Sequence, residues 1–288
     1  NITLGGTGKS PLVAYLVEAL KAKGYQPGVV SRGYGSALGK GEVKEVLASS
    51  FASDVGDEPL MLKLRVNCPI FVSSSRKLAV QQLEEAGCDV VIADDGLQHY
   101  ALERDVEICV FDGERKWGNS CLLPMGPLRE PFSRLNSTDF IVVNGGLKGE
   151  GALNKEDYFR SAYTMDLQAT ALRSLYSDET QAIENFQSQT VNAVAAIGNP
   201  ERFFQSLEAS GVCVLRHAFN DHHAYTASDL DFSNAFPVIM TEKDAVKCRS
   251  LDLDNAWYLP VSAKIDDELV NQVIMQLKKK YLRLNTET

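Results

Sequence analysis

The chain has 288 residues, 44% of them hydrophobic, which is enough to bury a large core and favours two domains over one. Its formal net charge is −9, from 29 basic and 38 acidic residues, and this argues against general nucleic-acid binding, which needs a basic surface. No stretch reaches about 18 consecutive apolar residues and no signal-peptide pattern is present, so the sequence predicts no membrane-spanning helix.

Helices and strands alternate along the first half of the chain. Apolar residues at helical spacing predict helices over 10–23, 58–64 and 76–85. Short apolar runs predict strands over 28–31, 69–72, 89–93, 107–111 and 140–143. These strands are apolar throughout, which fits a parallel sheet buried on both faces, so we predict a doubly wound α/β fold like that of P-loop proteins.

The polar segment 145–157 marks a boundary, after which the α/β pattern begins again. The later strands are predicted over 191–197, 212–215, 237–240 and 257–261, and the helices over 201–209 and 266–281. The sequence therefore predicts a nucleotide-binding domain over 1–160 and a smaller α/β domain over 161–288.

The six cysteines are scattered singly along the chain: Cys68, Cys88, Cys109, Cys121, Cys213 and Cys248. None of them belongs to a CxxC pair, and four lie in or beside apolar, strand-like runs. This pattern favours buried, reduced thiols over disulfides or a zinc site.

A glycine-rich loop near the start of the chain is the strongest functional signal: Thr3-Leu4-Gly5-Gly6-Thr7-Gly8-Lys9-Ser10. Glycines let backbone N–H groups converge on phosphate oxygens, and the following helix directs its positive end there. Lys9 can reach the β- and γ-phosphates, and the Ser10 hydroxyl can ligate Mg²⁺. Thr3 departs from the strict pattern, which has Gly. A glycine-rich turn with a chance Gly-Lys-Ser is the alternative, but the helix favours a nucleoside triphosphate site.

Phosphate loops follow a buried strand, whereas this loop begins almost at Asn1. We therefore expect the chain to be incomplete at its amino end, with a central strand lying upstream. Without that strand, we expect weak ATP binding and a low melting temperature.

Two acidic segments follow apolar strands or loops. Asp94 and Asp95 come directly after the strand 89–93, where carboxylates can hold Mg²⁺ or its water shell; the alternative is a tight turn. Arg129 can neutralise phosphate charge and Glu130 can support the metal, although a surface Arg–Glu pair explains them equally well.

Asp57 has two interpretations. It can cap the helix that begins near Pro59, or it can act as a general base that accepts a hydroxyl proton. The residue alone favours capping.

The only adjacent histidines occur in Asp221-His222-His223. One of them can reach across a cleft to a carboxylate or a phosphate, and the alternative is a solvated loop histidine. Thr241-Glu242-Lys243-Asp244 resembles the guanine-reading Asn-Lys-x-Asp motif, but Lys243 stands one place late, so we reject GTPase specificity.

Six motifs occur in an order that is more specific than any one of them; they lie at 5–10, 31–34, 56–59, 94–99, 123–130 and 241–244. With this set the chain resembles the tetraacyldisaccharide 4'-kinase family, the lipid A 4'-kinases of Gram-negative bacteria. The resemblance covers essentially the whole chain. The departures are Ser10, where many relatives have Thr, and the amino end.

The resemblance implies phosphorylation of the 4'-hydroxyl of a tetraacylated glucosamine disaccharide 1-phosphate, with ATP and Mg²⁺ as cofactors. It implies two α/β/α domains, joined by a two-stranded linker, with the nucleotide between them. It further implies that Asp57 is the catalytic base and that His222 pairs with it. Metal or phosphate roles are implied for Asp94, Asp95 and Glu130, with Arg129 near the γ-phosphate.

A lipid acceptor implies work at the cytoplasmic face of the inner membrane, as a peripheral or monotopic protein. We expect the membrane contact to come from the upstream amino end, from the apolar loop 122–128, or from both. Two other classes stay open: a P-loop ATPase that switches a partner, and a kinase or ligase that acts on a soluble metabolite.

Overall fold

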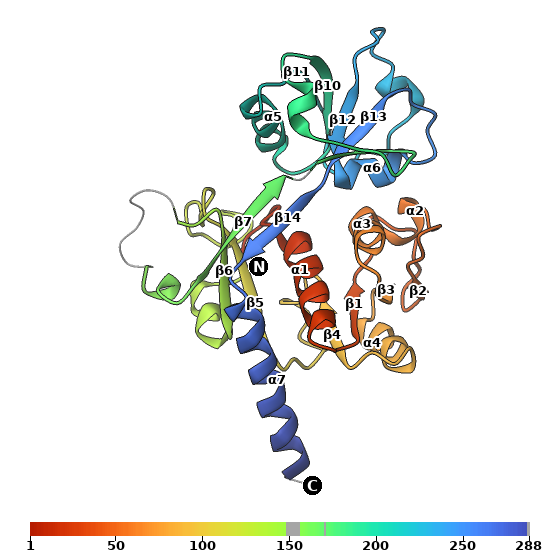
Figure 1. Cartoon of the computed structure of the whole chain (residues 1–288). Helices are drawn as coiled ribbons and strands as arrows, with labels where there is room; N and C mark the ends of the chain where they lie inside the picture. Colours follow the sequence, from red (N-terminus) through yellow and green to blue (C-terminus); the bar gives the residue numbers. More distant parts are fainter. Residues whose placement is uncertain (148–155, 170, 287–288) are drawn as a thin grey trace. The chain divides into compact units, whose positions relative to one another are not determined.

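A computed structural model describes residues 1–147, 156–169 and 171–286 (Figure 1). Contacts divide the chain into two units: unit 1 comprises Asn1–Val29, Gly87–Leu167 and Ala263–Thr288, and unit 2 comprises Val30–Ala86 and Gln168–Ser262. The predicted domains 1–160 and 161–288 stay a prediction, since the expected boundary segment 145–157 lies largely outside the described residues.

Unit 1 is built around a sheet in the order β14-β7-β6-β5, in which β5, β6 and β7 run parallel. Its elements are α1 (Lys9–Ala22), β4 (Val90–Ala93), β5 (Ile108–Asp112), η1 (Phe132–Ser137), β6 (Phe140–Asn144), η2 (Glu156–Phe159) and α7 (Glu268–Thr286). Three strands cross from one unit to the other along the chain: β1 (Pro27–Ser31), β7 (Tyr163–Ala169) and β14 (Val261–Ile265).

Successive residues of β5 enter different cores. Phe111 packs with Leu128 and Phe159 on one face of the sheet. Val110 packs on the other face with residues of α1 and α7, such as Leu16. Both faces of the strand are therefore covered, which is why its first four residues are apolar.

Unit 2 contains a larger sheet in the order β11-β10-β12-β13-β8-β9, of which the first four strands are parallel. Its first segment holds β2 (Val43–Glu45), α2 (Ala52–Val55), α3 (Asp57–Arg65), β3 (Ile70–Ser73) and α4 (Arg76–Glu85). Its second segment holds β8 (Leu172–Ser174), β9 (Thr180–Gln181), η3 (Ile183–Phe186), β10 (Thr190–Ala195), α5 (Pro200–Ala209), β11 (Cys213–Ala218), η4 (Ala227–Leu230), β12 (Val238–Thr241), α6 (Glu242–Cys248) and β13 (Ala256–Leu259).

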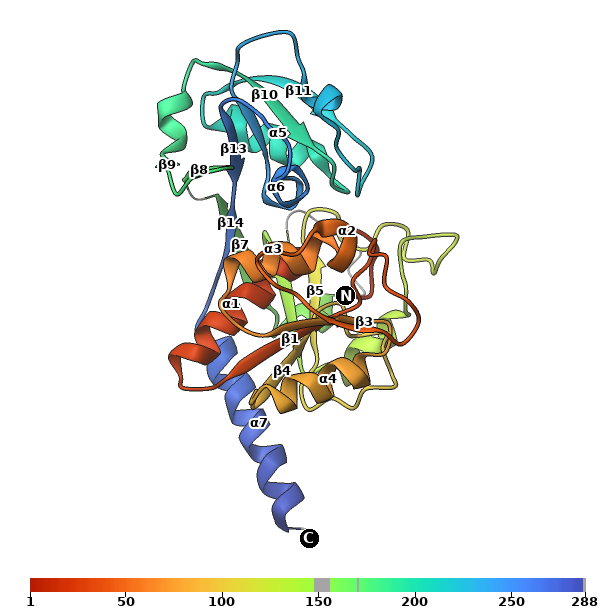
Figure 2. The same ribbon diagram turned by 90° about the vertical axis from the view of Figure 1, so that its right-hand side faces the viewer.

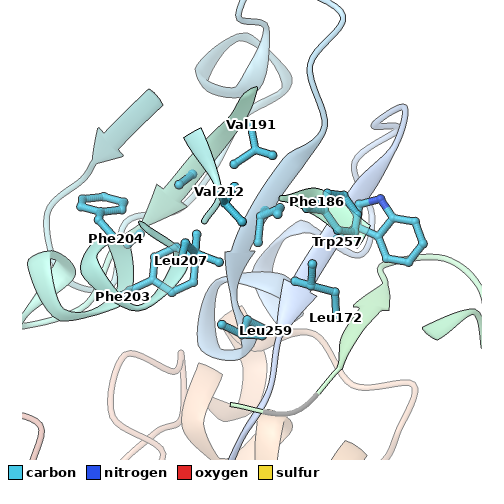
Figure 3. Packing of buried hydrophobic residues seen from close by; sticks show 12 residues of the cluster. Leu172, Phe186, Val191, Phe203, Phe204, Leu207, Val212, Trp257 and Leu259 are labelled. Atoms are coloured by element: carbon cyan, nitrogen blue, oxygen red, sulfur yellow. The ribbon is translucent and has the colours of Figure 1, made fainter. Parts of the chain in front are cut away.

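The larger sheet is also covered on both faces. Helix α5 packs against β10 and β11 (Figure 2), and Figure 3 shows its Leu207 in one cluster with Val212 and Trp257. The opposite cluster joins Val194 of β10 to Ala245 of α6. Helix α6 covers this second face and follows β12 directly, so its amino end lies at the carboxyl edge of the sheet.

The structure confirms the predicted α/β class and most predicted elements, with ends shifted by a few residues. The predicted strand over 257–261 is two strands, β13 and β14, separated by Pro260, which has no N–H to donate to a ladder. Short or polar elements were missed: β2, α2, β7, β8, β9 and α6.

All six cysteines lie in the described part of the chain and are free thiols. Three of them are buried, whereas Cys213 is exposed on β11, contrary to the expected burial. Among the described helices, none is both long enough and apolar enough to cross a bilayer.

Candidate active site

The glycine-rich loop leads directly into α1, as expected for a phosphate loop. Gly8 is the N-cap of the helix and has a φ of 92°. A Cβ added there would lie 2.9 Å from the Met165 Cε atom and 3.1 Å from the Asn144 Nδ2 atom. Asn144 Nδ2 also donates to the Thr7 carbonyl at 3.4 Å. The positive φ and these close neighbours favour glycine at this position, where the backbone turns into the positive end of α1.

Three charged side chains meet beside the loop, and we call them the phosphate cluster: Lys9, Asp95 and Arg129. The Lys9 Nζ atom lies 3.2 Å from Asp95 Oδ1, and the Arg129 Nη1 atom lies 2.8 Å from Asp95 Oδ2. Burial raises the pKa of the Asp95 carboxyl, but the two cations lower it by more than burial raises it. The pKa of Asp95 is therefore lowered to about 2. Asp95 is therefore a carboxylate that holds both cations in place.

The Asp94–Asp95 segment is also a turn, so the two interpretations of these acids are compatible. Asp95 adopts a left-handed conformation with φ of 49°, and Asp94 is buried. Strain of this kind is concentrated at functional sites, where the surroundings hold it.

Glu130 has partners other than Lys9, Asp95 and Arg129. Its Oε1 accepts from Gln98 Nε2 at 2.5 Å, and its Oε2 accepts from the Tyr100 hydroxyl and lies 3.2 Å from Arg134 Nε. Both carboxylate oxygens are engaged. The structure therefore brings Lys9, Asp95 and Arg129 together, but it gives Glu130 different partners.

The donor set fits Mg²⁺ carried by a nucleotide better than a closed metal cage. Mg²⁺ is usually bound by one or two carboxylates together with phosphates and waters. Over the described residues, no group of three or more His, Cys, Asp or Glu side chains is arranged to hold a metal. The Asp95 carboxylate lies beside Lys9, and Ser10 is in the first turn of α1, so an oxygen donor of the required kind is present next to the loop.

Arg115 was not predicted as a functional residue, but it lies over the phosphate loop. A Cβ added at Gly5 would be 2.5 Å from the Arg115 Nη1 atom. The Asp112 Oδ1 atom accepts from the backbone N–H of Glu114 and of Arg115, both at 3.0 Å. The sequence signal that could have indicated this position is Asp112, an aspartate at the end of a strand and before a turn.

The second group of functional residues centres on an Asp–His pair within unit 2. His222 Nδ1 lies 2.9 Å from Asp57 Oδ2, although the two residues are 165 positions apart. The Asp57 side chain is 6% exposed and that of His222 is 29% exposed. Asp57 Oδ1 accepts from the Glu58 N–H at 2.9 Å, and Gly56 is the N-cap of α3. Asp57 is thus the first residue of α3 and not its N-cap, and no side-chain hydrogen bond caps this helix, so the capping interpretation is wrong. Its carboxylate contacts the Glu58 N–H and His222.

Lys243 lies behind this pair, and we call the whole group the dyad cluster: Asp57, Glu58, Asp221, His222 and Lys243. The Lys243 Nζ atom is 3.2 Å from Glu58 Oε1 and 3.3 Å from Asp221 Oδ1. Thr241 caps α6 by accepting from the Asp244 N–H, so the motif that resembled a GTPase signature begins a helix.

A cavity of about 500 Å³ opens beside the dyad, a size typical of small-molecule sites. Tyr34, Asp57 and His222 line it together with residues from two further stretches, 48–53 and 246–250. The Tyr34 ring lies 5.0 Å from the His222 ring, between centroids. A Cβ at Gly56, whose φ is 92°, would lie 2.9 Å from the Tyr34 carbonyl oxygen, so Gly56 allows this close approach.

Comparison with known proteins identifies the family of the chain. The family model described as "LpxK: Tetraacyldisaccharide-1-P 4'-kinase" matches residues 1–278. The tetraacyldisaccharide 4'-kinase of Halorhodospira halophila is 47% identical over 98% of this chain and 83% of its own length. That of Methylobacillus flagellatus is 45% identical over 97% of this chain and 81% of its own length.

Solved structures add a likeness in fold. A crystal structure described as the "apo" form of LpxK from Aquifex aeolicus in complex with ATP has a TM-score of 0.76 and 24% identity, covering 96% of this chain and 86% of that one. The family match and the close relatives together show that the chain belongs to the tetraacyldisaccharide-1-P 4'-kinase family.

Proposed function

We propose that this protein transfers the γ-phosphate of ATP to the 4'-hydroxyl of a tetraacylated disaccharide 1-phosphate, a step of lipid A biosynthesis. The observation that carries the proposal is the Asp57–His222 pair on the wall of a ligand-sized cavity, in a chain that also has a phosphate loop. The phosphate loop supplies the donor site, and the dyad supplies a base for the acceptor.

The nucleotide is held by the loop amides, Lys9 and Arg129. The Lys9 and Arg129 cations both pair with the Asp95 carboxylate. Phosphate oxygens offer these cations stronger, charge-assisted partners, and the same cations then meet the charge that develops on the transferred group. Arg115, over Gly5, is a further donor at the same loop.

Mg²⁺ would be held by the Ser10 hydroxyl and by a carboxylate of Asp94 or Asp95, along with the phosphates. When bound, the ion neutralises phosphate charge. Glu130 supports this region through Gln98 and Arg134, because both of its oxygens are already engaged.

The acceptor hydroxyl gives its proton to Asp57. A sugar hydroxyl is a weak nucleophile, so a carboxylate within hydrogen-bond reach assists as the bond to phosphorus forms. Asp57 is almost fully buried and faces the cavity, where water competes little for it. His222 holds Oδ2, which fixes the orientation of the carboxylate.

The acceptor is a lipid, and we propose that the protein works at the cytoplasmic face of the inner membrane of Gram-negative bacteria. The loop 121–128 supports this, because Leu122, Leu123 and Met125 are exposed, Met125 by 80%. Leu4, also exposed, is joined to this loop by a hydrogen bond from its N–H to the Pro127 carbonyl. An apolar patch of this kind can enter the headgroup region.

The test of the activity is transfer of a radiolabelled γ-phosphate to the acylated disaccharide 1-phosphate in detergent micelles. We expect transfer to exceed ATP hydrolysis measured without the acceptor. Equal transfer to the deacylated disaccharide would favour a soluble acceptor, and hydrolysis without any transfer would favour an ATPase switch.

The test of the membrane contact is sedimentation with anionic lipid vesicles. The Met125→Ser, Leu123→Ser double variant should lose vesicle binding, whereas transfer to a short-chain acceptor should persist. If the double variant binds vesicles as well as the unmodified protein does, the loop is not the contact.

A further inference from the structure

Lys243 is the one cation of the dyad cluster, and it touches every other member. Besides Glu58 and Asp221, its Nζ atom lies 3.4 Å from His222 Nε2 and 3.9 Å from Asp57 Oδ2. The side chain is only 14% exposed. It therefore lies close to both residues of the dyad: it reaches the ring nitrogen of His222 that does not face Asp57, and it reaches Asp57 at Oδ2, the oxygen that His222 also contacts.

The shorter contacts of these groups favour one arrangement of the protons. Lys243 Nζ is the nearer partner of His222 Nε2, at 3.4 Å, whereas Asp221 Oδ1 lies 3.9 Å from it, beyond hydrogen-bond distance. A lysine ammonium can only donate, so the His222 Nε2 atom must accept. The imidazole proton then resides on Nδ1, from which it is donated to Asp57 Oδ2. In this tautomer the histidine is neutral and Asp57 stays an ionised acceptor.

We propose that Lys243 is a positioning residue that keeps His222 in its neutral Nδ1–H tautomer, so that Asp57 remains a free base for the acceptor hydroxyl. The inference rests on the proposed function for the role of Asp57, but the tautomer itself does not depend on it. Lys243 acts only through His222 and Asp57 and does not contact the reacting atoms.

Helix α6, which carries Lys243, is held in position by hydrogen bonds at its first turn. Thr241 Oγ1 donates to Asp244 Oδ2 at 2.6 Å, and the same carboxylate accepts from the Ala196 N–H at 3.1 Å. Asp244 is fully buried. These bonds tie the first turn of α6 to the end of β10, so the Lys243 backbone has little freedom to move away from the dyad.

The charges around Lys243 explain why a cation is needed there. Three carboxylates, those of Asp57, Glu58 and Asp221, surround it and the imidazole. Burial lowers the pKa of Lys243, but Glu58, Asp57 and Asp221 raise it, and the net direction is upward, so the ammonium persists. Without it, the three carboxylates would lie close together with no cation among them, and His222 Nε2 would lose the hydrogen bond from Lys243.

The kinetic test compares the pH dependence of kcat/KM in the unmodified protein and in Lys243→Met. Loss of the cation favours protonation of both His222 and Asp57, so the acid limb should move to higher pH by about one unit or more. The KM for ATP should not change, and Lys243→Arg should bring the acid limb back.

A control separates this role from simple support of α6. Arg65→Met removes the 3.1 Å ion pair to Glu242, which joins the same two helices, α3 and α6, next to Lys243 in the sequence. Arg65 is as shielded as Lys243, with 17% exposure. We expect Arg65→Met to lower the melting temperature without moving the acid limb. An unmoved limb in Lys243→Met, or the same movement in Arg65→Met, overturns the proposal.

A second measurement needs no variant of Lys243 and no activity. ¹⁵N NMR of the four histidines at pH 7.5, with His222 assigned by the signal lost in His222→Gln, reports which ring nitrogen carries the proton. We expect a neutral ring protonated on Nδ1. An Nε2–H tautomer or an imidazolium contradicts the proposal, whatever the transfer assay shows about the function.

Discussion

The phosphate cluster and the dyad cluster are built with opposite charge patterns. In the phosphate cluster two cations, Lys9 and Arg129, share one carboxylate, that of Asp95. In the dyad cluster one cation, Lys243, is surrounded by three carboxylates and an imidazole. The first has excess positive charge and suits an incoming polyanion. The second has excess negative charge and suits removal of a proton.

The largest effect should come from the base of the dyad cluster. Asp57→Asn keeps the shape but cannot accept the hydroxyl proton, so kcat should fall by about 10²–10⁴-fold. The affinity for ATP, measured by calorimetry, should stay within about twofold. The control is Asp54→Asn, three positions earlier in α2, where kcat should be almost unchanged. A near-normal kcat in Asp57→Asn would show that Asp57 is not the base.

The phosphate cluster should respond in a different way. Lys9→Ala removes a charge-assisted donor to the phosphates, so kcat should fall by about 10²–10³-fold and ATP should bind more weakly. Lys23→Ala, at the other end of α1, serves as the control and should behave as the unmodified protein. If Lys9→Ala lowers kcat and leaves the affinity for ATP intact, Lys9 does not contribute to ATP binding, and the proposed difference in role between the two clusters is wrong.

The histidines sharpen the comparison within the dyad cluster. A hydrogen bond to a charged group contributes about 1.5–3 kcal/mol, so His222→Ala should lower kcat/KM by about 10–100-fold. His223 instead contacts Asp229, at 3.3 Å, and His217 contacts Asn192, at 3.1 Å. Their alanine variants should lose less activity. Equal, small losses at all three positions would make His222 an ordinary loop residue.

The smallest effect concerns stability rather than rate. Because the pKa of Asp95 is lowered to about 2, its carboxylate stabilises the folded state above the unfolded pKa of about 3.9. This contribution is lost as the pH falls from about 4 towards 2. The difference in urea midpoint between the unmodified protein and Asp95→Asn should therefore be constant above about pH 5 and shrink below pH 4. A difference that does not vary with pH would mean that Asp95 is not held by its cations.

The sequence predicted the phosphate cluster in greater detail than the dyad cluster for a physical reason. Gly8, Lys9 and Ser10 are adjacent, and the spacing alone places them at a helix start. The partner of Asp57 is 165 positions away, so no local pattern could join it to His222; only the resemblance to a family did. The short helix α6 was missed because its start was compared with a GTPase motif, whereas Thr241 and Asp244 form a cap.

The same reasoning applies to the fold. Strands covered on both faces, such as β5 and β10, are mostly apolar and were predicted. Strand β7 was missed because only Met165 in it is buried and its other positions are polar or partly exposed. Arg115 was missed because its position over the loop depends on the turn after β5.

The contact between Gly56 and Tyr34 has an evolutionary consequence. Any side chain at position 56 would press on the Tyr34 backbone, which carries the ring that lies against His222. Positions 34 and 56 should therefore be epistatic: a change at 56 becomes tolerable only after the segment around 34 has shifted. Few substitutions are therefore tolerated in the part of the cavity wall formed by positions 34 and 56. Changes in acceptor preference should arise instead from substitutions in the segment 48–53, which also lines the cavity.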